Sequence, residues 1–100
     1  MRHWFCYFFT QNKIEYLRTN AGIDYPVDYH LDELENLLDP QLFFRINRQF
    51  IVNFNSIEKM SSVSKSRVKL ILKPKTEEDT IVSTERSPVF KEWLTGKVEN

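Results

Sequence analysis

The segment FFRINRQFIVN (residues 43–53) carries Arg45, Asn47, Arg48 and Gln49 between apolar flanks and contains no acid. An arginine can donate two hydrogen bonds to O6 and N7 of guanine, and asparagine or glutamine can bond adenine in the same two-point manner. Such recognition needs side chains held in a fixed place, which flanks anchored in a core would provide. The segment is therefore a candidate for reading the bases of duplex DNA.

Each of these polar side chains also has a purely structural interpretation. Arg45 would pair with an acid inside the fold, such as Asp39. Asn47 would cap the local turn, and Arg48 would be merely solvated. The residue types alone leave both interpretations open.

The apolar flanks indicate how the polar element is held. In a helical turn, Phe43, Ile46 and Phe50 fall near one side, away from the arginines. In a strand, Arg48 would share a face with Phe44 and Phe50, which suits a buried face poorly. We therefore predict a short helical turn that leads into a buried strand starting near Phe50. The side chains expected to anchor it in the core are Phe43, Phe44, Phe50, Ile51 and Val52.

Charge is unevenly distributed, although the formal net charge is zero and the pI is near 6.7. Residues 14–39 hold one base and seven acids, whereas residues 40–75 hold eight bases and one acid. This asymmetry suggests a side that faces a polyanion; the alternative is solvated strand faces that intermix in three dimensions. Lys73 and Lys75 flank an acidic loop and fit the alternative. The bases expected to contact phosphates are Arg45, Lys59, Lys65, Arg67 and Lys69.

The composition predicts one compact domain over residues 1–100. At this length folding buries roughly 60–70% of the surface of the unfolded chain, and 14% aromatic residues are ample for a core. A single cysteine, Cys6, cannot form an internal disulfide, which indicates a reducing compartment and a cytoplasmic protein. No apolar run approaches the ~20 residues that span a bilayer, and the aromatic start is interpreted as a strand rather than a signal peptide.

The hydrophobic pattern predicts a mainly β fold with about seven short strands and two short helices. Pro26 suggests an edge strand, and Asp39-Pro40 ends a first helix that buries a leucine stripe. A second helix starts near Ser87 as cap, with Pro88 at its first position and Gly96 beyond its last turn. The predicted strands are Trp4–Phe9, residues 13–18, 25–29, 57–60, 67–73 and 80–82 and the strand from Phe50, with turns at Thr10-Gln11-Asn12 and 20–22 and a polar loop at 61–66.

Residue sets for catalysis are scarce. His3 and His30 lie far apart and no HExxH or CxxC spacing occurs, so neither a metal nor another cofactor is expected. Cys6 lies within an aromatic strand and fits a packed thiol better than a nucleophile. The acids of the first predicted helix fit a solvated helix face. An enzyme is not expected.

Several stretches together resemble the LytTR DNA-binding domain, the output domain of many bacterial two-component response regulators. FFRINRQFIVN is the most specific of them. In order along the chain it is accompanied by NKIEYLRT, YPVDYHLDEL, a leucine helix ending in LDP, RVKLILKPKTEED and IVSTERSPVFKEWL. The resemblance covers roughly residues 4–95.

The resemblance implies an elongated arrangement of small antiparallel β-sheets with short helices, and a role in transcription regulation. It implies that two protomers bind paired repeats in promoter DNA through loops, rather than a long recognition helix, in the major groove. In the full system it also implies an upstream receiver domain and a sensor histidine kinase. The first strand of the family domain and a receiver domain are absent from this chain, which leaves a fragment, an excised domain and a standalone protein as alternatives.

The family's DNA-contacting positions map onto three connections of this chain. The turn after the first strand supplies Asn12 and Lys13, and the segment after the last strand supplies Thr84, Glu85 and Arg86. The central motif supplies Arg45 beside the base-contacting Asn47, Arg48 and Gln49. Family members often carry another basic residue near positions 84–85. This chain has Thr84 and Glu85 there, so Arg86 is the candidate substitute.

Another class of function remains as the alternative. A β-rich protein-interaction module would use Phe8, Phe9 and free strand edges to bind a partner chain. Such a module would be indifferent to duplex DNA and to salt. A nucleotide-processing enzyme is a more distant alternative, because the chain lacks a nucleophile or metal set.

Overall fold

The computed structural model describes residues 6–64 and 66–96, which form a mainly β fold with two short α-helices. The elements in chain order are β1 (Tyr7–Gln11), β2 (Ile14–Arg18), β3 (Asp24–Val27), α1 (Leu31–Leu37), β4 (Phe43–Arg45), β5 (Phe50–Asn53), the 3-10 helix η1 (Phe54–Ser56), β6 (Ile57–Ser64), β7 (Arg67–Leu72), β8 (Thr80–Val82) and α2 (Ser87–Leu94). No helix within the described ranges is long and apolar enough to cross a membrane.

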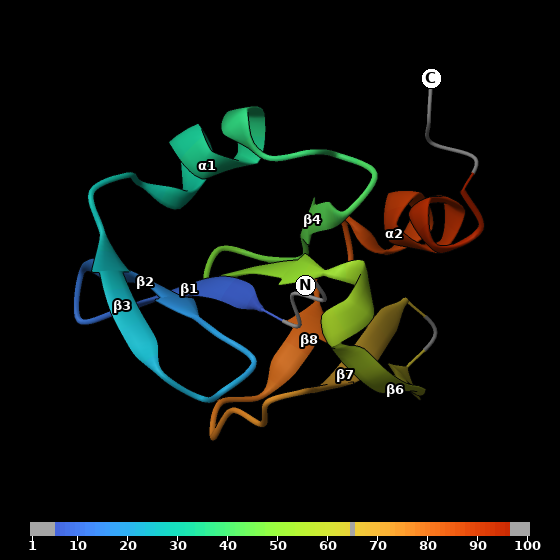
Figure 1. Cartoon of the computed structure of the whole chain (residues 1–100). Helices are drawn as coiled ribbons and strands as arrows, with labels where there is room; N and C mark the ends of the chain where they lie inside the picture. Colours follow the sequence, from blue (N-terminus) through green and yellow to red (C-terminus); the bar gives the residue numbers. More distant parts are fainter. Residues whose placement is uncertain (1–5, 65, 97–100) are drawn as a thin grey trace.

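The strands build two antiparallel sheets (Figure 1). The larger sheet has the order β3-β2-β1-β5-β4, and the smaller has the order β6-β7-β8. Pro26 lies in the edge strand β3, as predicted, where its missing N–H costs no ladder bond. The principal extents are 34 × 30 × 25 Å, so the elongation is modest.

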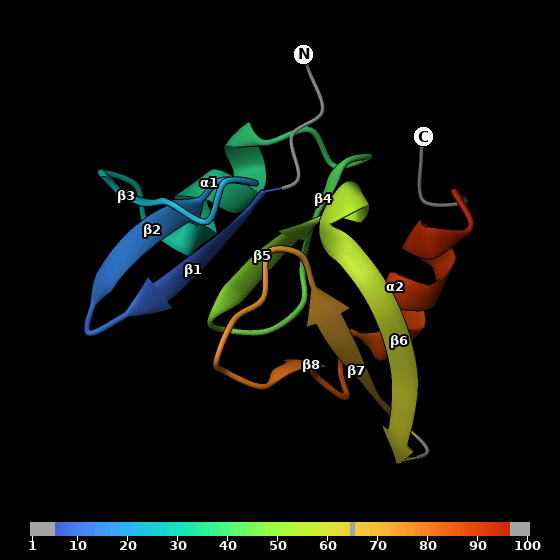
Figure 2. The ribbon, with the colours of Figure 1, turned by 60° about the horizontal axis from the view of Figure 1, so that its bottom comes forward.

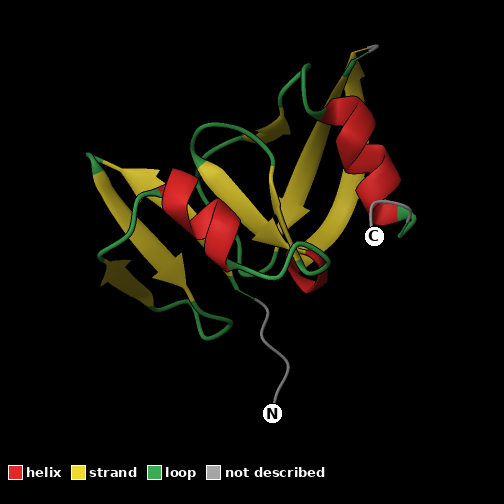
Figure 3. Cartoon of the chain, turned by 90° about the horizontal axis from the view of Figure 1, so that it is seen from above, coloured by secondary structure: helices red, strands yellow, loops and turns green. Residues whose placement is uncertain are grey.

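The central strands of the larger sheet, β1 and β5, have buried side chains on both faces. Along β1 and β5, alternate side chains point to opposite faces because a strand has a period of two residues. Phe8 and Ile51 pack against Leu31 and Leu34 of α1. The opposite face packs against the smaller sheet and α2, in a cluster formed by Tyr7, Phe9, Phe50, Val52, Val68, Leu70, Leu72, Val82, Phe90 and Trp93. Figure 3 shows α1 over the larger sheet and α2 beside the smaller one.

The predicted helical turn at residues 43–45 is wrong, because these residues form β4. Phe44 pairs with Val52 and Arg45 with Ile51 in an antiparallel ladder. The objection to a strand was that Arg48 would share a buried face with Phe44. It does not arise, because β4 ends at Arg45 and Arg48 lies in the following loop. The predicted start of the next strand at Phe50 is confirmed.

Other boundaries differ by a few residues from the predictions. Thr10 and Gln11 belong to β1, and the turn that follows is Asn12-Lys13. β6 continues through most of the predicted polar loop to Ser64. Trp4 and Lys65 lie outside the described residues.

The second helix lies where it was predicted, but its cap differs by one residue. Phe90 and Trp93 are buried, and Gly96 has the positive φ of 78° expected just beyond the last turn. The residue at the N-cap is Arg86 rather than Ser87. The Ser87 hydroxyl is buried and donates to the carbonyl oxygen of Ser83 over 3.0 Å.

Candidate nucleic-acid interface

The β4–β5 loop is a short hairpin connection closed by backbone hydrogen bonds. The Ile46 N–H donates to the Phe50 carbonyl oxygen over 3.1 Å, and the Ile46 side chain is fully buried. The Ile46 carbonyl oxygen accepts the N–H of Ser83 over 2.9 Å, which joins this loop to the residue after β8. The loop is thus anchored by an apolar side chain and by both sheets.

Asn47 holds the loop in shape. Its Oδ1 accepts the backbone N–H groups of Gln49 at 2.7 Å and Phe50 at 3.0 Å. Its Nδ2 donates to the carbonyl oxygen of Ile81 at 2.7 Å. An asparagine amide offers two donors and two acceptor positions, so three of its four are used inside the fold.

Arg45 is also used inside the fold. Its Nη1 lies 2.8 Å from Oδ1 of Asp32 and 3.2 Å from Oε1 of Glu35, and its side chain is only 10% exposed. Its Nε donates to the Asn47 carbonyl oxygen and its Nη2 to that of Arg48. Hydrogen bonding to Arg45 lowers the pKa of Asp32. An acid does pair with Arg45, but the suggestion of Asp39 was wrong.

The loop faces the β8–α2 connection across a surface hollow of about 690 Å³. Arg86 crosses this hollow: its Nη1 donates to Oε2 of Glu35 over 3.2 Å and to the Arg45 carbonyl oxygen over 3.1 Å. The residues that line the hollow are Asp32, Arg45, Asn47, Arg48, Gln49, Ser83, Thr84, Glu85 and Arg86. The structure therefore brings together two of the three segments singled out in the sequence.

Arg48 and Gln49 differ from their neighbours in the loop. Both are exposed, and neither side chain forms a hydrogen bond or ion pair with another of the described residues. Thr84 and Glu85 are exposed on the other wall of the hollow. Arg48 and Gln49 therefore present free donors, and Gln49 a free acceptor, from a loop whose backbone is held by several hydrogen bonds.

The β1–β2 turn lies at the same end of the larger sheet. Asn12 and Lys13 have φ values of 53° and 67°, the left-handed pair that closes a two-residue hairpin, and both side chains are exposed. The N–H of Thr10 donates to the carbonyl oxygen of Gln49 over 3.0 Å, so this hairpin runs directly beside the β4–β5 loop. Figure 2 shows the turn, the loop and the far end of β6 along the lower side of the ribbon.

A match to a known family decides what this arrangement is. A family model described as the LytTr DNA-binding domain matches residues 6–95. The chain belongs to the LytTR DNA-binding domain family. Among solved structures, this LytTR domain is similar to the LytTr DNA-binding domain of a protein described as a methyl-accepting/DNA response regulator from Bacillus cereus. The two have a TM-score of 0.77 and 28% sequence identity, over 89% of this chain and 79% of that one. No curated protein matches the chain.

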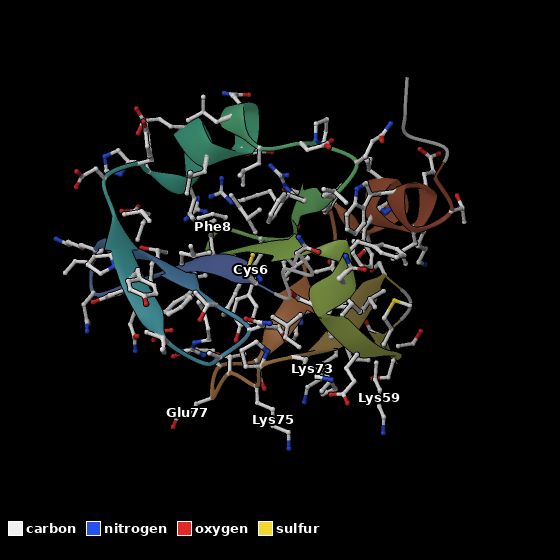
Figure 4. All side chains as sticks on the ribbon, in the orientation of Figure 1. Cys6, Phe8, Lys59, Lys73, Lys75 and Glu77 are labelled. Atoms are coloured by element: carbon white, nitrogen blue, oxygen red, sulfur yellow. The ribbon has the colours of Figure 1, made fainter. Side chains whose placement is uncertain are left out.

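The basic residues predicted to contact phosphates are less clustered in the structure of this LytTR domain than their closeness in the sequence suggests. Arg67 begins β7 opposite Ser64, at the far end of β6. Lys69 is half-buried and lies 3.8 Å from Asp79, and Lys59 projects from the smaller sheet on the side away from the helices (Figure 4). None of these three lines the hollow.

The residues considered for a protein-interaction module or an enzyme are Phe8, Phe9, Cys6 and the metal-binding side chains. Phe8 and Phe9 are buried, so they are not exposed for a partner chain. The Cys6 thiol is buried, and burial raises its pKa, as expected for a packed thiol. Within the described ranges, no three His, Cys, Asp or Glu side chains are grouped to hold a metal ion.

The sequence interpretation missed the part that α1 plays in the LytTR site. Asp32 and Glu35 were interpreted as a solvated helix face, yet both hold arginines at the hollow. One signal was available: acids three residues apart lie on the same face of a helix. The helix is followed by a basic segment that has no acid of its own.

Proposed function

We propose that this LytTR domain is the transcription-regulating output domain of a two-component response regulator. It binds promoter DNA sequence-specifically, with two protomers on paired repeats. In this proposal the β1–β2 turn, the β4–β5 loop and the β8–α2 connection enter the major groove. A bacterial cytoplasmic protein, a receiver domain upstream and a sensor histidine kinase complete the proposed system. The DNA-binding family and the similarity to a domain described as part of a DNA response regulator support this proposal.

The observation that carries the proposal is the contrast within the β4–β5 loop. The side chains of Arg45 and Asn47 form hydrogen bonds with the loop and its neighbours. Those of Arg48 and Gln49 are exposed and unpaired among the described residues. A rigid frame that presents free arginine and amide groups is what base recognition requires. We therefore assign base contacts to Arg48 and Gln49, and positioning roles to Arg45 and Asn47.

The remaining contacts follow from position. Asn12 and Lys13 extend from the neighbouring hairpin turn, and Arg86 extends from the opposite wall of the hollow. We assign these three to base edges as well. Arg67 is assigned to a phosphate near the end of β6, with Lys59 and Lys69 as outer contacts. Lys65, which lies outside the described residues, is assigned to a phosphate from the sequence alone.

Selection from random duplex DNA with the purified chain tests the proposal. We expect enrichment of a repeated sequence whose half-sites are spaced near one helical turn. Binding to that sequence should fall with salt, with a log–log slope of about −0.9 for each phosphate contact. A scrambled duplex of equal length serves as the control. Enrichment of no sequence, or binding that ignores salt, would refute the proposal.

A further inference from the structure

Two arginines, one at the end of β4 and one at the N-terminus of α2, share one carboxylate in this domain. Oε1 of Glu35 lies 3.2 Å from Nη1 of Arg45, and Oε2 lies 3.2 Å from Nη1 of Arg86. Glu35 comes from α1, while Arg86 lies 51 residues later and caps α2. The carboxylate therefore joins the helix over the larger sheet to the far wall of the hollow.

The two arginines are held to different degrees. Arg45 uses all three of its nitrogens in contacts and is 10% exposed. Arg86 is 40% exposed and is held through Nη1 alone, by Glu35 and by the Arg45 carbonyl oxygen. Across residues 6–64 and 66–96, no hydrogen bond engages Nε or Nη2 of Arg86.

This geometry leaves one edge of the Arg86 guanidinium free. Nε and Nη2 are two donors in a fixed plane, the arrangement that suits bidentate recognition. An arginine anchored at one nitrogen loses fewer conformations on binding than one that is free to turn. Removal of the anchor should therefore cost discrimination between bases more than overall attraction to DNA.

We propose that Glu35 is a positioning residue that aims the Nε–Nη2 edge of Arg86 at a base of the duplex. This inference rests on the proposed function. In this arrangement Glu35 of α1 holds Arg86 in place, and Arg86 is a second base-contacting arginine on the wall of the hollow opposite Arg48. A contrary role for Glu35 would be to shield Arg86 from DNA, as a counter-charge that the duplex must displace. The two roles predict opposite effects when the carboxylate is lost.

The test compares Glu35→Gln with Glu33→Gln, which makes the same chemical change two residues away. The Glu33 carboxylate accepts the N–H of His30 and contacts neither arginine, and glutamine supports the same helix cap. Each variant is titrated with the selected duplex and with its scrambled version. For Glu35→Gln we expect the ratio of specific to scrambled affinity to fall about tenfold, within the discrimination of one bidentate arginine. The ratio for Glu33→Gln should stay unchanged.

A double variant locates the effect. In an Arg86→Ala background, Glu35→Gln should leave the affinity ratio unchanged, because the side chain that it positions is gone. A further fall would mean that Glu35 acts through Arg45, and would overturn the inference. So would a ratio for Glu35→Gln that is unchanged or raised. If Glu35→Gln does not melt like the parent chain, Glu35→Ala takes its place.

The outcome for the parent chain separates the two proposals. A parent chain that selects a sequence, with a Glu35→Gln variant of equal selectivity, overturns only the role of Glu35. A parent chain that selects no sequence overturns both.

Discussion

Asn47 joins the two sheets of this domain: its Nδ2 donates to the carbonyl oxygen of Ile81 in β8 over 2.7 Å, while its Oδ1 accepts two N–H groups of its own loop. One side chain thus sets both the shape of the β4–β5 loop and its place beside the β8–α2 connection. The position of Arg48 therefore depends on the hydrogen bond between Asn47 and Ile81, which lie 34 residues apart in the sequence.

Asn47→Ala should destabilise the fold and blur recognition together. The substitution leaves three partner groups without their bond, at a cost of about 1–3 kcal/mol in the free energy of unfolding. Denaturant titration beside DNA titration checks this. Asn47→Asp is the comparison: it can keep both accepted bonds, but it replaces the donor to Ile81 with a charged oxygen that faces the Ile81 carbonyl oxygen. An alanine variant that unfolds at the same denaturant concentration as the parent would contradict the role assigned to Asn47.

Arg48→Ala should lower sequence specificity and leave the general affinity for DNA nearly unchanged. We expect a cost of about 1–3 kcal/mol on the preferred duplex, relaxed preference at one base pair and little loss on scrambled DNA. Arg67→Ala should instead weaken all sequences nearly equally and flatten the salt slope by about one. Thermal melts should match the parent for both. Equal losses on both duplexes for Arg48→Ala would make Arg48 a phosphate contact only.

Phe44→Ala should act through stability. The Phe44 ring packs 5.5 Å from the ring of Phe90 and 5.2 Å from that of Trp93, measured between centroids, and ties β4 to α2. Because the side chain is half-buried rather than fully buried, we expect a loss of about 3 kcal/mol, at the low end for a phenylalanine. DNA binding at temperatures below the lowered melting point should be largely kept. A normal melt with lost binding would contradict this.

Glu85→Arg should tighten binding. Glu85 is exposed on the wall of the hollow and would repel phosphates if that wall approaches DNA. We expect higher affinity for specific and scrambled duplexes alike, with a salt slope steeper by about 0.9 if the new arginine gains one phosphate contact. Glu92→Arg, on an exposed turn of α2 outside the hollow, is the comparison. Equal effects of the two substitutions would place residue 85 away from the duplex.

Asp24→Asn should make the free energy of unfolding less dependent on pH in the acid range. Arg18 donates to both carboxylate oxygens of Asp24, at 2.6 and 2.8 Å, and this bonding lowers the pKa of Asp24. A lowered folded-state pKa adds stability above the ordinary range of an aspartate, and that stability is lost as pH falls through the folded value. The variant should therefore be less stable near neutral pH and vary less with pH below about 4. Denaturation across pH checks this, and high salt should shrink the difference because Asp24 is one-third exposed.

Local chemistry alone determined much of this fold. The strand predicted at residues 67–73 matches β7, in which Val68, Leu70 and Leu72 alternate on the buried face, and Pro26 predicted an edge. Pro88 predicted the start of the last helix to within one residue, and Gly96 predicted its end. These features depend on a residue and its near neighbours, so the chain carries them wherever it folds. The family resemblance likewise depended on short contiguous motifs.

The tertiary structure decided which polar side chains are free. Arg45 and Arg48 are the same residue type three positions apart, yet acids from α1 hold one and the other stays unpaired among the described residues. Residues 43–45 became a strand because β5 offered them a ladder of backbone bonds, which outweighs a local helical pattern. A local pattern does not specify which residues 10 to 51 positions apart will pair, and these pairings decide which polar side chains are held and which are free to contact DNA.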